Sequence, residues 1–272
     1  MPKSKIPIEQ LLADLHDADF MARSDAAREL GKSGNPRAVA ALLPNLNDPD
    51  WRVRRNAVQA LGGLKAKAAV GGLIAALEDR TLTVRTRAAV ALGRIKDPGS
   101  IQALLVALQP GDGRVSESAA QALKKFGKAA IPAIKAELET TAASSRQDKE
   151  KLCLLEILAE LRCVDALDGL VALLDDADSM VRWRVLMALA NLPDQRARQI
   201  VIGVLSSSDP LMRIYAAQAV ARMNDPIAAA VLVGLLKDPV LSGLSGEVNR
   251  AVTGALQVLA HLPKEYAGVI HN

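Results

Sequence analysis

Apolar residues recur along this chain with a period of 31 residues. A marker leucine or valine, followed by glycine in its first three copies, stands at Leu30, Leu61, Leu92, Leu123, Leu158, Leu189 and Val220. Two steps differ: 35 residues separate Leu123 from Leu158, and 39 separate Val220 from Leu259, at polar or Gly-rich insertions. A constant period of this length indicates a repeat protein in which each repeat is one supersecondary unit.

Each period contains two predicted helices. In the first helix, apolar residues follow the i, i+3, i+4, i+7 spacing of one helix face, as in Ile8/Leu11/Leu12/Leu15, Val39/Leu42/Leu43/Leu46, Val70/Leu73/Ile74/Leu77 and Ile101/Leu104/Leu105/Leu108. In the second helix they follow i, i+4, i+7, i+8, i+11, as in Val53/Ala57/Ala60/Leu61/Leu64 and Val181/Val185/Ala188/Leu189/Leu192. Each pair leaves an apolar face that only a neighbouring pair can cover. We therefore predict one right-handed all-α solenoid of about eight antiparallel helix pairs over residues 1–272.

Helix boundaries are indicated by capping residues. Asn35-Pro36, Asp97-Pro98 and Asp225-Pro226 each place an N-cap before a proline suited to the first helical position, and Asp48-Pro49 does the same before a second helix. Gly31, Gly62 and Gly93 fall near the expected ends of second helices, where glycine often caps. The polar segment 140–150 is expected to be a hinge or a long loop. The segment 238–247 is expected to be an irregular insertion before a C-terminal capping repeat.

The recurring string D-x4-V-R-x5-A-L-G carries a family resemblance. It runs from Asp48 to Gly62 and from Asp79 to Gly93, and returns without the glycine from Asp176 to Leu189. It resembles the HEAT-repeat proteins, in particular the short prokaryotic repeats named after phycobilisome lyases, over nearly the whole chain. The resemblance implies an α-solenoid with the second helices on the concave side, and a role as a scaffold for protein partners.

The resemblance also assigns a structural role to the Asp and Arg of the motif, which contact neighbouring repeats in that family. Arginine suits such pairing because its guanidinium binds a carboxylate through two parallel hydrogen bonds. The predicted ladder consists of Asp48, Arg54, Asp79, Arg85, Asp176 and Arg182. Arg23 and Arg213 share the arginine position, whereas Ser116 and Lys151 occupy it in two repeats, so we expect the ladder to be interrupted there.

Residues beside the buried stripe of the second helices are the candidates for partner contact. We predict a concave binding face formed by Arg52, Arg55, Gln59, Arg87, Gln121, Trp183, Arg184, Tyr215 and Gln218. Tryptophan, tyrosine and arginine dominate interface hot spots, which favours this set. Packing of Trp183 against a neighbouring helix is the alternative. Trp51 shares its repeat position with Phe20 and Leu82, so we expect it to pack near its helix start.

Composition and charge agree with a helical binding protein. Hydrophobic residues make up 50% of the chain but aromatic residues only 2%, which suits closely packed helices. The net charge of +4 is uneven: residues 1–140 hold 21 Lys and Arg against 15 Asp and Glu, and residues 141–272 hold 13 against 15. This basic bias suits an acidic partner, but it falls short of the concentrated stripe of a nucleic-acid-binding protein.

No constellation for catalysis, a metal or a cofactor is found in the sequence. His16, His261 and His271 are scattered and no His-Glu dipeptide is present, which argues against the di-iron site of HEAT proteins resembling deoxyhypusine hydroxylases. Cys153 and Cys163 are ten residues apart and are expected to be buried apolar residues rather than a redox pair. The acidic cluster 175–179 coincides with a turn between helices, so we interpret it as helix capping rather than a calcium site.

We therefore expect a non-enzymatic scaffold or adaptor that binds a protein partner in the groove lined by the second helices. The alternatives are a lyase-like chaperone that presents a bilin or another cofactor to a client protein, and a nucleic-acid-binding solenoid. Two cysteines without a disulfide framework, no signal-like N-terminus and no long apolar run predict a monomeric cytoplasmic protein with no membrane span.

Overall fold

The computed structural model describes residues 6–108, 112–142 and 148–223 of the 272-residue chain. Within these ranges the regular structure is entirely helical. The chain divides into two compact units, Met1–Ala143 (unit 1) and Ser144–Asn272 (unit 2). The boundary falls inside the segment 140–150; a hinge or long loop there stays a prediction. The eighth helix pair and the insertion 238–247 lie outside the described residues.

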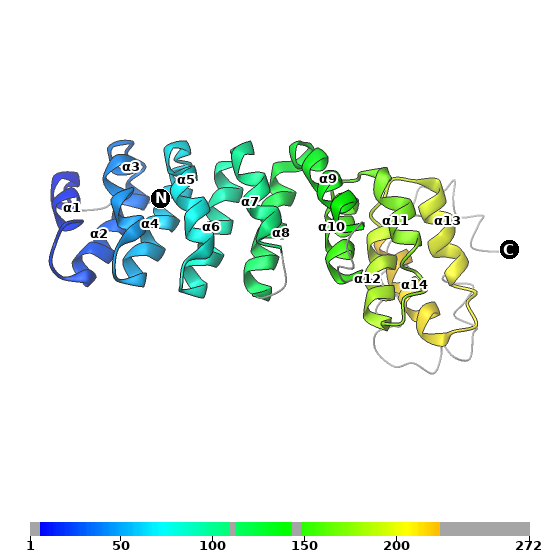
Figure 1. The fold of residues 1–272 in the computed structure, drawn as a ribbon. Helices are drawn as coiled ribbons and strands as arrows, with labels where there is room; N and C mark the ends of the chain where they lie inside the picture. The colour runs from blue at the N-terminus through cyan, green and yellow to red at the C-terminus, as the bar shows by residue number, and fades with distance from the viewer. Residues whose placement is uncertain (1–5, 109–111, 143–147, 224–272) are drawn as a thin grey trace, which may run out of the picture. The chain divides into compact units, whose positions relative to one another are not determined.

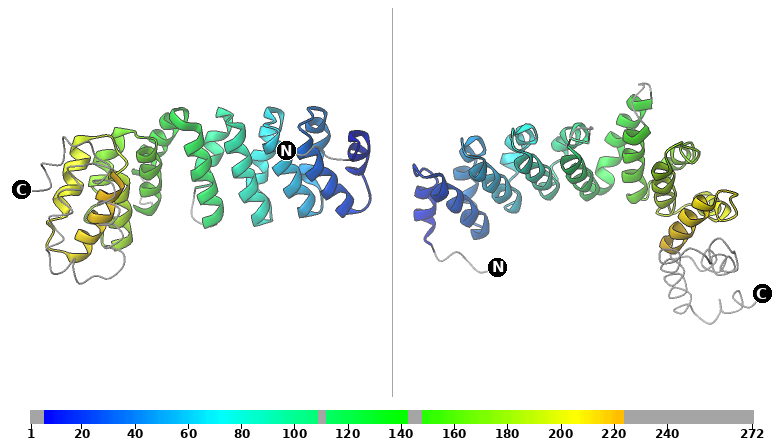
Figure 2. Two further views of the ribbon diagram at one scale, coloured as in Figure 1. Left: turned by 180° about the vertical axis from the view of Figure 1, so that it is seen from behind. Right: turned by 90° about the horizontal axis from the view of Figure 1, so that it is seen from below.

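Unit 1 is built from two layers of helices. Its second helices are α2 (Phe20–Ser33), α4 (Trp51–Gly63), α6 (Leu82–Ile95) and α8 (Gly113–Phe126), and they pack side by side in chain order (Figure 1). The other layer contains α1 (Ile8–Asp14), α3 (Arg37–Leu42), α5 (Val70–Ala75), α7 (Ile101–Val106) and α9 (Ile131–Ala142). The view from below in Figure 2 shows the two layers of this unit. Unit 1 is thus a row of helix pairs, as the 31-residue period predicts.

The first helices are shorter than the apolar pattern predicts. Short 3-10 segments interrupt or extend them: η1 (Pro44–Asn47), η2 (Lys67–Ala69), η3 (Ala76–Glu78), η4 (Pro98–Ser100) and η5 (Gly127–Ala130). Pro44 lacks an amide hydrogen and cannot continue the hydrogen bonding of α3, and Gly71 and Gly72 weaken α5. The apolar residues nevertheless keep one buried face, because a 3-10 turn follows nearly the same path as an α-helical turn.

Unit 2 continues the same construction. Its second helices are α10 (Asp148–Glu160), α12 (Ser179–Leu189) and α14 (Pro210–Met223), which pack in chain order. Its first helices are α11 (Leu167–Val171), preceded by η6 (Val164–Ala166), and α13 (Gln195–Val204). The marker residues lie in the core of their units: Leu30, Leu61, Leu92, Leu123, Leu158 and Leu189 are fully buried and Val220 is 1% exposed. The all-helical repeat fold is therefore confirmed.

The glycines after the markers have a role that capping does not describe. Gly31, Gly62 and Gly93 lie inside the last turns of α2, α4 and α6, not after them. A Cβ atom built on Gly62 would lie 2.5 Å from the Cβ of Ala91 and 2.8 Å from its Cα. Gly31 and Gly93 meet Ala60 and Ala122 in the same way. The predicted C-caps are thus close-approach positions that let successive second helices touch.

The predicted N-caps are right for first helices and displaced for second helices. The side chain of Asn35 accepts a hydrogen bond from the amide of Arg37, and that of Asp97 accepts one from Gly99. In contrast, α4 is capped by Asp50, which accepts from the amide of Arg52, rather than by Asp48. Asp48 instead accepts from the Asp50 amide and binds an arginine of the preceding repeat. The motif aspartate therefore joins repeats, and the next aspartate caps the helix.

Candidate partner-binding face

The motif arginines make bonds in two directions. Arg54 donates through Nε and Nη2 to the carboxylate of Asp79 in the next repeat, at 2.6 and 3.0 Å. Its Nη1 donates to the main-chain oxygens of Asp48 and Pro49, in the turn before its own helix, at 2.7 and 3.0 Å. Only 6% of the side chain is exposed. Each such arginine therefore clamps its own turn to the aspartate of the following repeat.

The same clamp recurs in unit 1 and weakens in unit 2. Arg23 binds Asp48 at 2.7 and 3.0 Å, and Arg85 binds Asp112 and the main-chain oxygen of Asp79. In unit 2, Arg182 binds the main-chain oxygen of Asp176 at 2.7 Å, but its nitrogen lies 3.7 Å from the carboxylate of Asp209.

Ser116 replaces the arginine on α8. Its hydroxyl donates to the main-chain oxygen of Leu108, within its own repeat. A serine side chain is too short to reach the next repeat, which accounts for the missing link in chemical terms.

A second set of positions faces away from these clamps. On each second helix, four residues spaced i, i+4, i+7 and i+11 share one face, which we call the open stripe. In unit 1 it consists of Met21, Asp25, Arg28 and Lys32 on α2, Arg52, Asn56, Gln59 and Gly63 on α4, Thr83, Arg87, Val90 and Arg94 on α6, and Arg114, Ser118, Gln121 and Lys125 on α8. All are exposed except Asn56, Val90 and Ser118.

The predicted contact residues of unit 1 differ in how free they are. Gln59, Arg87 and Gln121 are exposed, and none of them has a partner among the described residues. Arg52 binds Asp50 through two nitrogens at 3.0 and 2.9 Å. Arg55 lies beside the open stripe, half-buried, and donates to Asn56 at 3.2 Å.

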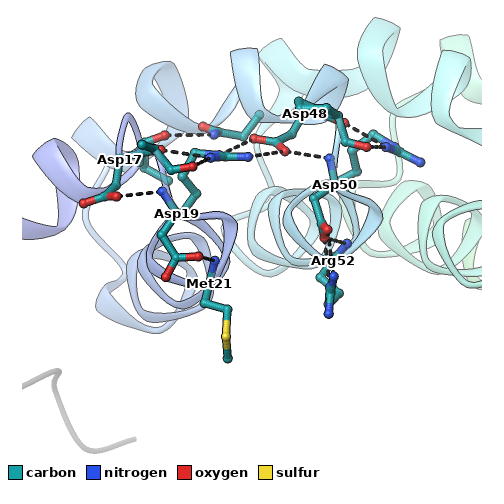
Figure 3. A network of polar contacts seen from close by, with 12 residues as sticks. Asp17, Asp19, Met21, Asp48, Asp50 and Arg52 are labelled. Carbon is teal, nitrogen blue, oxygen red and sulfur yellow. Dashed lines mark hydrogen bonds and ion pairs between the residues drawn. The ribbon is translucent and has the colours of Figure 1, made fainter.

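Arginines stack on aromatic rings at the start of α4. The Arg52 guanidinium lies 4.0 Å from the ring centre of Phe20, and that of Arg55 lies 5.3 Å from the ring of Trp51. Trp51 remains 37% exposed, so the expectation that it packs into the core is wrong. Figure 3 shows the side chains of Met21 and Arg52 projecting to one side, away from the network around Asp48. The hydrogen bonds from Arg52 lower the pKa of Asp50 to about 2.

In unit 2 the predicted residues are connected to each other. Arg184 binds the carboxylate of Glu156 on α10 through two nitrogens at 2.8 and 2.6 Å, and this pairing raises its pKa. Trp183 donates from Nε1 to the side-chain oxygen of Gln218 on α14 at 2.8 Å. Tyr215 is half-buried. Arg184 and Trp183 therefore link neighbouring helices as well as lining the open stripe.

The open stripe of each unit is hollowed at equivalent places. In unit 1 a hollow of about 170 Å³ is lined by Arg28 and Lys32 of α2, Asn56 and Gln59 of α4, and Arg94 of α6. In unit 2 a hollow of about 190 Å³ is lined by Glu156 and Glu160 of α10, Trp183, Arg184 and Met187 of α12, and Arg222 of α14. Four alignments show the shared register: Arg28 with Glu156, Lys32 with Glu160, Gln59 with Met187 and Arg94 with Arg222.

The sequence offered a signal for one row of this face that the motif comparison missed. A cation stands two residues after the marker in four repeats, as Lys32, Arg94, Lys125 and Arg222. The Arg184–Glu156 pair was also missed. It joins oppositely charged residues 28 positions apart, which is three less than the repeat period.

Other candidate sites hold little chemistry in the described part of the chain. A larger hollow of about 430 Å³ beside α5 and α7 is lined mainly by apolar residues such as Ile74, Leu77 and Val106, and it borders Asp112, which directly follows undescribed residues. Across the described ranges, no group of three or more His, Cys, Asp or Glu side chains is placed to hold a metal ion. Cys153 and Cys163 are half-buried rather than buried, and neither forms a disulfide bond.

Within those same ranges, no helix is both long and apolar enough to cross a membrane.

Solved structures similar to this chain support its fold. A chain of the complex between Kap95p and RanGDP matches 98% of this chain and 42% of its own length, with 12% identity and a TM-score of 0.65. The complex of CpcE and CpcF of phycocyanin lyase from Nostoc matches at 24% identity over 95% of this chain and 98% of the other, with a TM-score of 0.40. Human deoxyhypusine hydroxylase matches at 20% identity over 94% and 96%, also with a TM-score of 0.40.

No curated protein sequence matches the chain. The family model for HEAT repeats does, at residues 8–82, 39–124, 70–152 and 154–252, which together cover most of its length. These matches agree with the 31-residue register, the paired helices and the Arg–Asp clamps between repeats. The chain belongs to the HEAT-repeat family.

Proposed function

We propose that this protein is an interaction scaffold that holds an extended segment of a partner protein against the open stripes of its second helices. The observation that carries the proposal is the pair of hollows at the same repeat positions in the two units. A repeat that forms a hollow at a fixed register offers successive sites for the side chains of a polypeptide. HEAT repeats commonly serve such a role, and the proposal takes the protein to act as a cytoplasmic monomer without a catalytic step.

The size of the hollows favours side chains over a cofactor. Each measures less than 200 Å³, whereas pockets for small molecules and cofactors are typically about 300–1,000 Å³. Their floors include small residues, Gly31, Ala60 and Gly63 in unit 1 and Ala188 in unit 2. Amide and charged groups surround them, which suits hydrogen bonding to a peptide backbone. These features favour the scaffold over the bilin-handling alternative.

Photo-crosslinking at defined positions tests the proposal. A photoreactive amino acid is placed at Gln59, Gln121 or Tyr215 on the open stripes, or at Gln102 on α7 or Gln199 on α13 as exposed first-helix controls. Each variant is irradiated in extract from the native host, and adducts are identified by mass spectrometry. We expect one protein to be crosslinked from the stripe positions and not from the controls. Adducts from the controls alone would place the partner on the other layer and refute the proposal.

A further inference from the structure

The open stripe of unit 1 is strongly basic, although the chain as a whole is only weakly so. Of its sixteen positions, seven hold Lys or Arg and one, Asp25, is acidic. Helices α4 and α6 each contain three arginines and no acidic residue. The equivalent positions of α12 and α14 are mostly uncharged, with Met180, Met187, Leu211 and Tyr215 among them. The positive charge is therefore gathered on one face of one unit.

The cations of α6 and α8 are the ones left without a counter-charge. On α2, Arg28 pairs with Asp25 at 2.9 Å, and Lys32 pairs with Glu29 at 2.7 Å. On α4, Arg52 pairs with Asp50 at 2.9 Å. Arg87, Arg94, Arg114 and Lys125 are exposed and have no ion-pair partner in the described part of the chain. Charge is thus available to a ligand mainly on α6 and α8.

Helix-dipole compensation explains only part of this arrangement. Cations in the last turn of a helix interact favourably with its C-terminal carbonyls, which accounts for Arg94 and Lys125. Arg87 lies near the middle of α6 and Arg114 in the first turn of α8, where the dipole gives no benefit or opposes a positive charge. These two arginines have no described role within the fold.

We propose that the open stripe of α6 and α8, extended by Gln59 and Gln121, binds an acidic segment of a partner protein. This inference rests on the proposed scaffold function and names the chemistry of its partner. Arg87 and Arg94 are seven residues apart on one face of α6, so they lie about 10 Å apart along it. Arg114 and Lys125 repeat the pattern on the neighbouring helix. Carboxylates of an acidic segment would pair with these four cations, and the two glutamine amides would bind its backbone.

The spacing of the helices defines the motif that fits. Packed helices lie about 8–10 Å apart. A polyproline-II segment rises about 3.1 Å per residue with three residues per turn, so every third side chain faces the same way, about 9 Å apart. Glutamates at every third position would therefore meet successive second helices.

Two observations favour an acidic polypeptide over single-stranded nucleic acid. Surfaces that bind single strands combine cations with aromatic side chains on which bases stack. The open stripes of α6 and α8 contain no aromatic residue, and the rings of Phe20 and Trp51 on neighbouring repeats already carry Arg52 and Arg55. The stripe instead offers glutamine amides between its cations, which match peptide N–H and C=O groups.

Fluorescence anisotropy with the purified full chain tests this inference. The probes are a labelled peptide of repeated Glu-Pro-Ala triplets, its Gln-Pro-Ala counterpart and a single-stranded oligonucleotide of similar length. The test variant is Arg87→Gln with Arg94→Gln. The matched control is Lys67→Gln with Lys128→Gln, which removes the same charge from exposed positions on η2 and η5. Circular dichroism verifies that both variants keep the wild-type helicity.

We expect the glutamate peptide to bind wild type and control alike, and the test variant about tenfold more weakly, as two exposed ion pairs would contribute. Equal binding of the glutamine peptide, an unchanged affinity of the test variant or tighter binding of the oligonucleotide would each overturn the inference. The scaffold proposal fails separately: if Gln59 and Gln121 still crosslink a host protein while the glutamate peptide does not bind, only the preference for acidic partners is wrong.

Discussion

Arg54 shows how one side chain holds two repeats together. Its guanidinium satisfies the main-chain oxygens of its own turn and binds the carboxylate of Asp79 in the next repeat. Both side chains are largely buried, at 6% and 11% exposure. A buried ion pair is not by itself a source of stability, but removing one partner leaves the other charge without compensation.

Replacing Arg54 with alanine should therefore destabilise unit 1 by about 3 kcal/mol, the loss typical of breaking a buried pair. Arg52→Ala is the matched control, because the Arg52–Asp50 pair lies at the surface and should contribute less than about 1 kcal/mol. Urea unfolding followed by circular dichroism measures both. Equal losses for the two variants would show that the clamp does not hold repeats together.

The clamp also predicts a pH dependence. Burial raises the pKa of Asp79, but hydrogen bonds from the Arg54 side chain and the Thr81 amide outweigh burial and hold the pKa below its usual 3.8. A carboxyl whose pKa is lower in the folded state stabilises the fold at pH values above its unfolded pKa. That contribution is lost as pH falls below about 4 and through the folded-state pKa.

We expect the free energy of unfolding of the wild type to fall over this acid range, and that of Asp79→Asn to fall less because one of the titrating groups is gone. Unfolding by urea at several pH values between neutral and strongly acidic measures the difference. Parallel curves for the two proteins would mean that Asp79 has the same pKa folded and unfolded.

At the scale of helices, the closest approach in unit 1 is made through glycine. Gly62 faces Ala91 so closely that a methyl group would overlap the backbone of α6. Its neighbour Gly63 is exposed, and nothing lies within 4 Å of the position a Cβ would take. Adjacent residues of one helix end thus differ in whether any side chain fits.

Gly62→Ala should destabilise the protein by about 1–3 kcal/mol, because α4 and α6 must move apart. Gly63→Ala should be neutral or stabilising by up to about 1 kcal/mol, since alanine restricts the unfolded chain. Thermal unfolding of the two variants decides the point. If both shift the midpoint equally and in the same direction, the close contact at Gly62 does not limit helix packing.

The same comparison shows what sequence can and cannot predict at this scale. The period located every second helix from α2 to α14, since a buried stripe of fixed spacing identifies a helix face. It could not distinguish a capping Gly62 from a packing one, because that depends on which residue of the next helix lies opposite. Nor could it show that Arg184 is engaged by Glu156, as spacing within one helix says nothing about contacts across repeats.

At the scale of the whole chain, the two units meet at the segment that the sequence identified as polar. Unit 1 ends at Ala143 and unit 2 begins at Ser144, within the predicted hinge or loop 140–150. Exposed segments of small polar residues are preferred sites of proteolysis. The segment contains Arg146 and Lys149 as sites for trypsin.

Brief digestion with trypsin should therefore cut first within 140–150 and release two fragments of similar size. Arg80 and Lys96 lie in the short turns of unit 1 and serve as internal references for accessibility. Mass spectrometry of the earliest fragments gives the order of cleavage. Cleavage at the turns before, or together with, the segment would contradict a hinge or long loop there.

The Arg–Asp clamps have a mechanical consequence. In unit 1 they join each repeat to the next one in sequence, so repeats pulled from the two ends of the unit carry load in series, like links of a chain. The weakest link should yield first, and the rest should then give way one by one. Each freed repeat would release 31 residues, or roughly 100 Å of extended backbone at about 3.3–3.6 Å per residue. Stretched in an optical trap, unit 1 should therefore lengthen in steps of that size, acting as an extensible tether for whatever it holds.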